Sequence, residues 1–355
     1  RKQKEVPMKK VLLVMSMVVL FSMGISVYAE TDDMGAYQFP VIPGTDEWKE
    51  LSTHDEMMEV CMIPDKFISD ASTEALLKSV LENPMMMDFI YFDDPKEAYQ
   101  TMKSVSGLRP LLNRDNCLEV MIYAYKTIEQ PCEDDLDSRS FFLEPLYEFL
   151  FSCYEIENDV ELSDELVNMI YSRVSDRMLS GEYSMNTCYY HREDLSAAVA
   201  SAGSVWTPVN GVVYTPVGNP VGAVYSRSPE LTSSEIQQYI SQVISSYPNA
   251  QLIGNPTIKY NCHSFAWYNR STANPYWINV YPSIYVSDGS YSSYNGVPSY
   301  GMVGVYSGGT HSCLFMGGSI SDGFIARSKW GAAGLYQHSY LYSPYGNSVL
   351  FYKPN

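Results

Sequence analysis

The sequence predicts an α+β protein in which an acidic helical domain precedes a domain built on an antiparallel sheet. The 355 residues carry a net charge of −18, which is unevenly distributed. Residues 30–200 contain 36 Asp and Glu against 12 Lys and Arg, whereas residues 201–355 contain 4 against 6. Apolar residues recur at helical spacing before position 200, and 18 of the 30 tyrosines follow it. We therefore expect two domains, 30–200 and 201–355.

The first 29 residues have the pattern of a secretory signal peptide. Residues 8–10 (Met-Lys-Lys) precede an apolar run over 11–27, and Val-Tyr-Ala ends at Ala29. This pattern predicts cleavage after Ala29, and the paired lysines favour a bacterial signal. The alternative is an uncleaved anchor, because about 17 apolar residues are at the lower limit for crossing a bilayer. No second run of that length follows, so we expect a secreted, extracellular or cell-wall-associated protein without a stable membrane span.

Capping residues and apolar spacing predict the helices of the acidic part. Residues 141–151 are apolar almost throughout and are expected to be buried between helices. The three methionines at 85–87 are expected to pack in the core, with an adaptable binding patch as the alternative. The expected N-caps are Ser72, Asp94, Asn113 and Ser163, and they precede apolar faces over 76–81, 98–105, 117–125 and 166–178.

The second part is expected to contain one long helix, one short helix and several strands. Thr232 and Glu235 have the spacing of a capping box, which predicts a helix through Ile244. An extended piece then leads to the segment 261–268, and a loop rich in Tyr, Ser and Asn covers 271–300. β-Branched runs with Gly-rich turns predict strands within 212–224 and at 302–306, 311–316, 324–330 and 347–353.

Cys262 is the candidate nucleophile. The chain has seven cysteines, an odd number that leaves at least one free or paired between molecules. Most are expected to be buried as small hydrophobic residues. Cys262 differs because it precedes the apolar residues 265–267, which predict a short buried helix. The positive end of a helix dipole lowers the pKa of a thiol, as a nucleophile requires. The alternative is a buried structural cysteine.

His311 is the candidate general base among five histidines. It starts a predicted strand after a Gly-Gly turn that leaves room for a substrate, and it lies 49 residues after Cys262. His263 is less well placed, because adjacent helical side chains point about 100° apart. His54 and His191 have no companion motif. The alternative for His311 is a strand-end histidine that hydrogen-bonds to a backbone carbonyl.

Two motifs resemble those of a known family. Residues 261–267 (Asn-Cys-His-Ser-Phe-Ala-Trp) are similar to the nucleophile segment of the NlpC-like and CHAP-like papain-like cysteine peptidases. Residues 328–331 (Ser-Lys-Trp-Gly), with Gly334 and His338, look like a motif of relatives of that group. The resemblance covers about residues 255–345. It implies a papain-like domain over 201–355, in which an antiparallel sheet packs on the nucleophile helix.

The resemblance also implies a thiol amidase or endopeptidase. Cys262 would be the nucleophile and His311 the general base, while the orienting residue is either Ser328 or His338. The substrate would be a peptide, or a stem peptide of peptidoglycan, and no cofactor is expected. A zinc site formed by Cys262, His263, His311 and Cys313 is the less favoured interpretation, because the usual ligand spacing is missing.

Two further hypotheses remain open at this stage. The protein is alternatively a non-catalytic extracellular module that binds glycan or protein through its aromatic loops. The acidic domain is alternatively an inhibitor of its own C-terminal domain. The net charge of −18 argues against a nucleic-acid partner, because no broad basic surface is present to neutralise phosphate.

Overall fold

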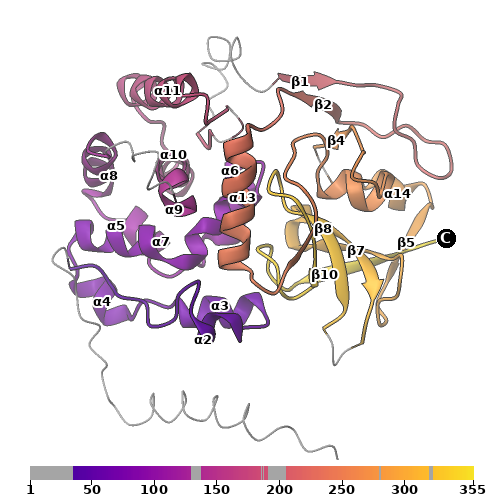
Figure 1. Ribbon diagram of the computed structural model, residues 1–355, viewed down its shortest axis with the longest axis horizontal. Helices are drawn as coiled ribbons and strands as arrows, with labels where there is room; N and C mark the ends of the chain where they lie inside the picture. Colours follow the sequence, from indigo (N-terminus) through magenta and orange to yellow (C-terminus); the bar gives the residue numbers. More distant parts are fainter. Residues whose placement is uncertain are drawn as a thin grey trace, which may run out of the picture.

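Helices form one side of the molecule and antiparallel sheets form the other (Figure 1). The structure is a computed structural model that describes residues 35–128, 137–184, 186, 188–190, 205–279, 281–319 and 323–355. The expected signal peptide, together with Cys132 and His191, lies outside the described residues. Within the described ranges, no helix is both long and apolar enough to span a membrane.

The acidic part folds into short helices whose starts agree with three of the four expected caps. Ser72, Asp94 and Ser163 each accept a hydrogen bond from a backbone N–H in the first turn of the helix that follows. The Asn113 cap was wrong: Asn113 ends α7, and Asn116 precedes α8. The elements are α2 (Asp46–Lys49), α3 (His54–Val60), α4 (Asp65–Asp70), α5 (Thr73–Glu82), η1 (Pro84–Tyr91), α6 (Pro95–Met102), α7 (Leu108–Leu112), α8 (Cys117–Lys126), α9 (Ser138–Phe141), α10 (Leu143–Asn158) and α11 (Asp164–Leu179).

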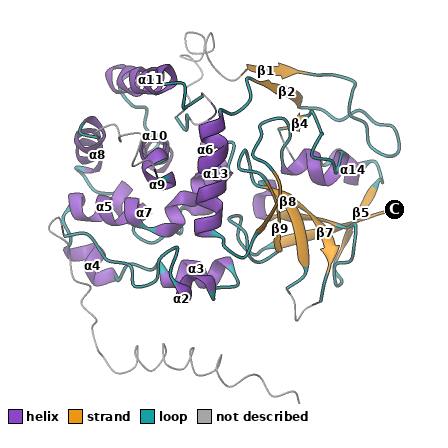
Figure 2. Cartoon of the chain, viewed as in Figure 1, coloured by secondary structure: helices purple, strands orange, loops and turns teal. Residues whose placement is uncertain are grey.

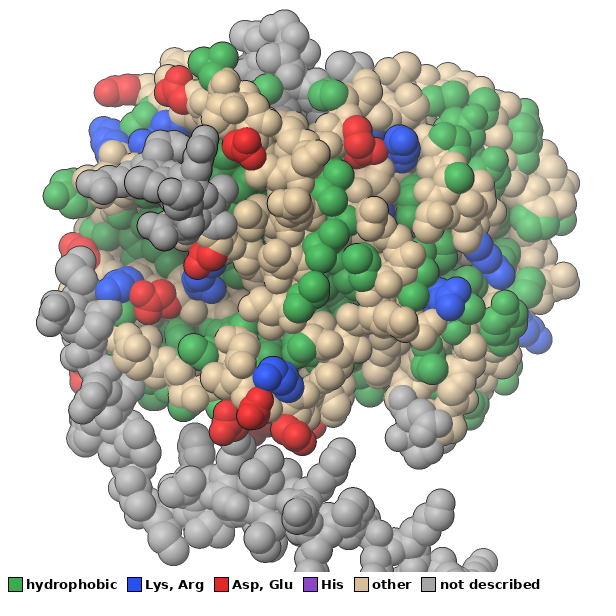
Figure 3. Space-filling view, in the orientation of Figure 1, with side chains coloured by type: hydrophobic (Ala, Val, Ile, Leu, Met, Phe, Trp, Pro, Cys, Tyr) green, Lys and Arg blue, Asp and Glu red, His purple; other side chains and the backbone are tan. Residues whose placement is uncertain are grey.

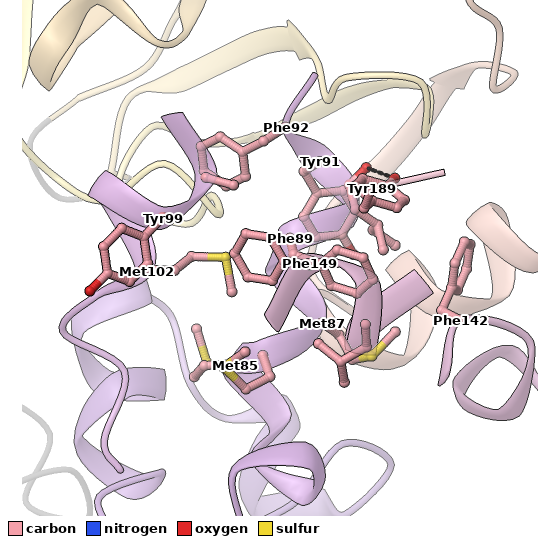
Figure 4. Packing of buried hydrophobic residues seen from close by; sticks show 14 of the residues in the cluster. Met85, Met87, Phe89, Tyr91, Phe92, Tyr99, Met102, Phe142, Phe149 and Tyr189 are labelled. Carbon is pink, nitrogen blue, oxygen red and sulfur yellow. Dashed lines mark hydrogen bonds between the residues drawn. The ribbon is translucent and has the colours of Figure 1, made fainter. Parts of the chain in front are cut away.

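The methionines of η1 pack in the core, as the sequence predicts. Met85, Met86 and Met87 are at most 2% exposed. Figure 4 shows Met85 and Met87 beside the aromatic side chains that follow them in η1. The Phe89 ring stacks on Phe149 of α10, with ring centroids 5.4 Å apart. Thioethers and aromatic rings fill this interior, so the alternative of an exposed methionine patch is excluded.

Two antiparallel sheets make up most of the remaining chain (Figure 2). This arrangement confirms the α+β class in its coarse form. The smaller sheet has the order β1-β2-β4, and the larger one has the order β3-β9-β8-β7-β6-β10-β5. The strands are β1 (Val205–Pro208), β2 (Val224–Ser228), β3 (Gln251–Gly254), β4 (Trp277–Ile278), β5 (Tyr291–Tyr294), β6 (Val303–Tyr306), β7 (Ser312–Gly317), β8 (Ile325–Lys329), β9 (Leu335–Ser339) and β10 (Val349–Pro354).

The sequence analysis missed the strands β1, β4, β5 and β9. The strands expected within 212–224 were wrong: apart from Val224, which starts β2, this segment forms only an isolated bridge between Tyr214 and Pro220. The expected loop over 271–300 contains α14 (Ile284–Ser287) as well as β4 and β5, and β5 forms an edge of the larger sheet by pairing with β10. The segment that carries His338 is β9, which pairs with β8. The four later strands that the sequence predicts correspond to β6, β7, β8 and β10 with ends shifted by one or two residues.

Helix α13 (Ser233–Ser246) lies between the helices and the sheets (Figure 1). The predicted capping box is confirmed, because Thr232 and Glu235 exchange hydrogen bonds between side chain and backbone. Glu235 also accepts from the backbone and hydroxyl of Ser184. At the other end of the helix, the Trp48 indole N–H donates to the Ser246 carbonyl. One hydrophobic cluster includes residues from both sides of position 200, so the helices and the larger sheet share a core.

The composition change near position 200 coincides with the change from helices to strands, and the division into two domains stays a prediction. On the face shown in Figure 3, acidic side chains lie over the helical part and the centre together with several lysines and arginines, whereas the charged side chains over the sheet side are lysines and arginines. The distribution of charge in the sequence is therefore visible on this surface.

Candidate functional site

Cys262 opens a short buried helix, as the sequence predicts. Residues 262–268 are helical, and the last five of them form the wide turn η4 (Ser264–Tyr268). Asn261 holds the start of this helix: its Oδ1 accepts from the Ser264 and Ile278 N–H groups, and its Nδ2 donates to the Ile278 carbonyl. The helix packs on β7 and β8. An antiparallel sheet packed on the helix that carries Cys262 is therefore present.

The Cys262 thiol does not have the lowered pKa that its place at a helix start predicted. The side chain is 5% exposed, and loss of solvation raises its pKa well above the ordinary value. The backbone N–H groups of Ser312 and His263 donate towards the sulfur and oppose this shift, whereas the nearby carboxylates of Asp93 and Glu97 add to it. A helix of two turns cannot offset burial of this extent. The resting thiol is therefore protonated.

His311 lies directly before β7, one residue from the Ser312 N–H that points at the Cys262 sulfur. The ring is fully buried, and burial lowers its pKa well below the ordinary value, with further lowering by His263 and His338. Neither ring nitrogen has a hydrogen-bond partner among the described residues. His311 is thus a neutral imidazole with an unoccupied proton acceptor, next to the segment that contacts the thiol.

A pair of Trp–Ser–His hydrogen-bonded groups accompanies this centre. In the first, Ser312 Oγ lies 3.0 Å from the Trp267 indole nitrogen and 2.8 Å from His263 Nδ1. In the second, Ser328 Oγ lies 3.0 Å from the Trp330 indole nitrogen and 2.8 Å from His338 Nε2. An indole N–H only donates, so each serine oxygen accepts from tryptophan and retains its own proton for the histidine.

Ser328 and His338 therefore bond to each other and do not orient His311. His338 Nδ1 lies 2.8 Å from the Ser339 carbonyl, which only accepts, so Nδ1 carries the proton and Nε2 accepts from Ser328. Both nitrogens of His338 are occupied. The expected hydrogen bond that would hold His311 in place is not formed by either candidate. The structure instead places an aromatic ring against His311: Tyr345 is parallel to it within 8°, with ring centroids 3.5 Å apart.

Charged residues beside Cys262 were not recognised from the sequence. Lys329 is fully buried, and its ammonium donates to the carbonyls of Thr257 and Gly331. Burial lowers the Lys329 pKa, and Asp93, which precedes α6, opposes that shift. Lys329 could have been recognised as a site residue, because it lies within the motif Ser-Lys-Trp-Gly. Asp93 could not, because the sequence Asp-Asp-Pro indicates only a helix cap.

The described residues show no group of three or more His, Cys, Asp or Glu placed to hold a metal ion, and this includes the four residues of the zinc interpretation. The six described cysteines are all buried and free of disulfides. They are Cys61, Cys117, Cys153, Cys188, Cys262 and Cys313.

Because His338 is buried, the folded protein should lose stability in acid, and a substitution of this residue measures its share of the loss. Burial lowers the His338 pKa from 6.5 to about 4 in the folded protein. The unfolded chain therefore takes up a proton at a higher pH than the folded protein, and stability present above pH 6.5 is lost as the pH falls towards 4. Relative to His338→Gln, wild type should lose about 2–3 kcal/mol of unfolding free energy between pH 7.5 and 4.5.

Urea unfolding of both proteins at the two pH values measures this difference. The comparison removes the contributions of the other titrating groups, which both proteins share. Parallel stability profiles would show that His338 titrates normally in the folded state.

Comparisons with known proteins gave no relatives: no family model matches the chain, and neither a curated protein nor a solved structure is significantly similar to it.

Proposed function

We propose that the protein is a secreted cysteine hydrolase that cleaves amide bonds in cell-wall peptide or in protein, with the papain-like mechanism that its motifs resemble. The observation that carries the proposal is the placement of two groups. The Cys262 sulfur lies beside the first residue of β7, and His311, a neutral base with no hydrogen-bond partner among the described residues, directly precedes that residue.

The protonation states decide how such a site would work. Because burial raises the thiol pKa and lowers the imidazole pKa, the resting pair is a neutral thiol and a neutral imidazole. His311 would take the thiol proton as the sulfur attacks the substrate carbonyl, and would then give that proton to the departing amine. Water would hydrolyse the thioester and release the free enzyme. The thiol would therefore become a thiolate only when substrate is bound, and the resting site would contain no preformed thiolate–imidazolium pair.

Backbone N–H groups beside the Cys262 sulfur would stabilise the oxyanion of the proposed reaction. The backbone N–H groups of His263 and Ser312 point towards the Cys262 sulfur, so a carbonyl attacked by that sulfur would lie close to both. Two backbone donors fixed by a helix and a strand are suited to a developing negative charge.

The second candidate is a non-catalytic extracellular binding module. It is favoured by one observation, that His311 makes no hydrogen bond to Cys262 or to an orienting residue within the described chain. In this case the site would be relict and binding would use the exposed aromatic residues, among them Tyr300.

The test is product analysis of the full chain. The protein is incubated with a panel of peptidoglycan fragments and unfolded proteins, and new termini are identified by mass spectrometry. In a parallel series, iodoacetamide at pH 8.5 modifies the thiols before the assay. We expect cleavage to fall in proportion to modification of Cys262, and substrate to slow that modification. If no member of the panel is cleaved while a glycan or protein is bound, the second candidate replaces the first.

A further inference from the structure

The Tyr345 ring stacks on the imidazole of His311. The two rings are parallel within 8° and their centroids are 3.5 Å apart. Tyr306 touches the same imidazole edge-on, with centroids 5.2 Å apart. Since both imidazole nitrogens lack hydrogen bonds to described residues, aromatic contacts rather than a polar third residue determine the plane of this ring.

The helical part of the chain holds Tyr345 in place. The Tyr345 hydroxyl donates to the Tyr91 carbonyl at 2.7 Å, and this bond is buried. Phe92 packs edge-on against the Tyr345 ring, with centroids 5.0 Å apart. Tyr91 is the last residue of η1, so a tyrosine from the end of the chain is anchored 254 residues earlier.

A glycine of the Ser-Lys-Trp-Gly motif lets this anchor come close. Gly331 has φ +46°, and a Cβ at this position would lie 2.6 Å from the Tyr91 carbonyl oxygen. That distance is far inside van der Waals contact, so only glycine fits between β8 and the end of η1. The Tyr91 carbonyl is thus in contact with the Tyr345 hydroxyl and lies close to Gly331.

We infer that Tyr345 is a positioning residue that fixes the imidazole plane of His311, and that the end of η1 supplies the anchor that keeps Tyr345 in register. The inference rests on the proposed function for its catalytic consequence. It also assigns a role to the acidic helical part, which completes the site of the other part. Burial raises the pKa of the Tyr345 hydroxyl, and Cys262 adds to this shift.

The experiment compares three variants of the full chain. Tyr345→Leu removes the ring, Tyr345→Phe keeps the ring and loses the hydroxyl, and Gly331→Ala leaves Tyr345 intact but displaces the Tyr91 carbonyl. The first readout is the NMR titration of His311, which needs no enzymatic activity. The second is the separation of kcat from KM on a cleaved substrate.

We expect Tyr345→Leu to raise the pKa of His311 towards 6.5, because water then reaches one face of the ring. The same variant should lower kcat by about 10²-fold with little change in KM, since a misplaced base impairs proton transfer rather than binding. Tyr345→Phe keeps the stacked ring but loses the bond to the Tyr91 carbonyl, so it should show a partial effect comparable to that of Gly331→Ala. Both variants should resemble weaker forms of Tyr345→Leu.

Tyr342→Leu is the matched control. Tyr342 is 2% exposed and packs on Tyr247, so its truncation leaves a comparable cavity without removing a ring from His311. The inference is overturned if folded Tyr345→Leu keeps the wild-type titration of His311, or if the control shifts it equally. If Tyr345→Leu does not fold, a wild-type titration in Gly331→Ala overturns it instead. Failure of the proposed function is recognised separately, because wild type then cleaves nothing.

Discussion

Replacement of Cys262 by alanine is expected to reduce hydrolysis by about 10³-fold or more, because the covalent intermediate can no longer form. A water attack promoted only by His311 and the backbone donors would account for the residual rate. The measurement is kcat/KM of Cys262→Ala on whichever fragment wild type cleaves, with binding of that fragment measured in parallel. Binding should persist, because the variant removes only a buried sulfur.

Cys313→Ala is the control for this substitution. Cys313 is completely buried, lies two residues after His311, and is paired with Gly304 on the neighbouring strand β6. Its truncation therefore creates a similar small cavity without removing the candidate nucleophile, and we expect kcat/KM to stay near the wild-type value. Equal losses in both variants would indicate damage to the sheet and would refute the assignment of Cys262.

Replacement of Arg177 by methionine is expected to lower the unfolding free energy by about 3–5 kcal/mol, the largest stability effect that the structure predicts. The Arg177 side chain is 3% exposed and pairs with Glu144 and Glu148, which are 7% and 0% exposed. Glu148 also accepts from the Tyr189 N–H at 3.1 Å, so the network ties α10 and α11 to the segment before the sheets. Without the guanidinium, two carboxylates would remain buried with reduced compensation.

Urea denaturation at pH 7.5 measures this effect, and two further variants make it specific. Arg109→Met breaks a pair with Glu157 in which the arginine is 57% exposed, so solvent screens the interaction and a much smaller change is expected. Adding Glu148→Gln to Arg177→Met should recover part of the lost stability, because one uncompensated buried charge is removed. An Arg177→Met protein as stable as wild type would mean that the network makes no net contribution to folding.

Local sequence rules predicted those elements whose signals are contained in a few adjacent residues. The capping box at Thr232 and the cap at Asp94 depend on hydrogen bonds that span three residues, so they can be recognised without knowledge of the fold. The Asn113 cap failed because Asn116 lies closer to the same apolar face, and cap positions three residues apart cannot be separated by spacing alone. Strand β5 was missed because its pairing partner β10 lies at the end of the chain.

In the candidate site, too, the features set by adjacent residues were predicted and those set by distant residues were not. The candidate nucleophile Cys262 and the candidate base His311 were chosen from their order and local setting, and the helix that Cys262 opens is present. Their electrostatics were not predictable, because the helix position indicated a lower thiol pKa, whereas burial against β7 and β8 raises it. Neither Ser328 nor His338 orients His311, because these two residues form a hydrogen bond with each other.

The sequence by itself determined the α+β class, the acidic helical part, the longer helices, four strands of the larger sheet and the two chemically distinctive residues, because patterning, capping and motif order are local properties. Only the tertiary structure decided what surrounds those residues. It stacked Tyr345 on His311, anchored that ring on the Tyr91 carbonyl, and brought Asp93 near Lys329. These contacts join residues that are 34 to 254 positions apart in the chain, and desolvation and ring stacking arise only when such segments pack together.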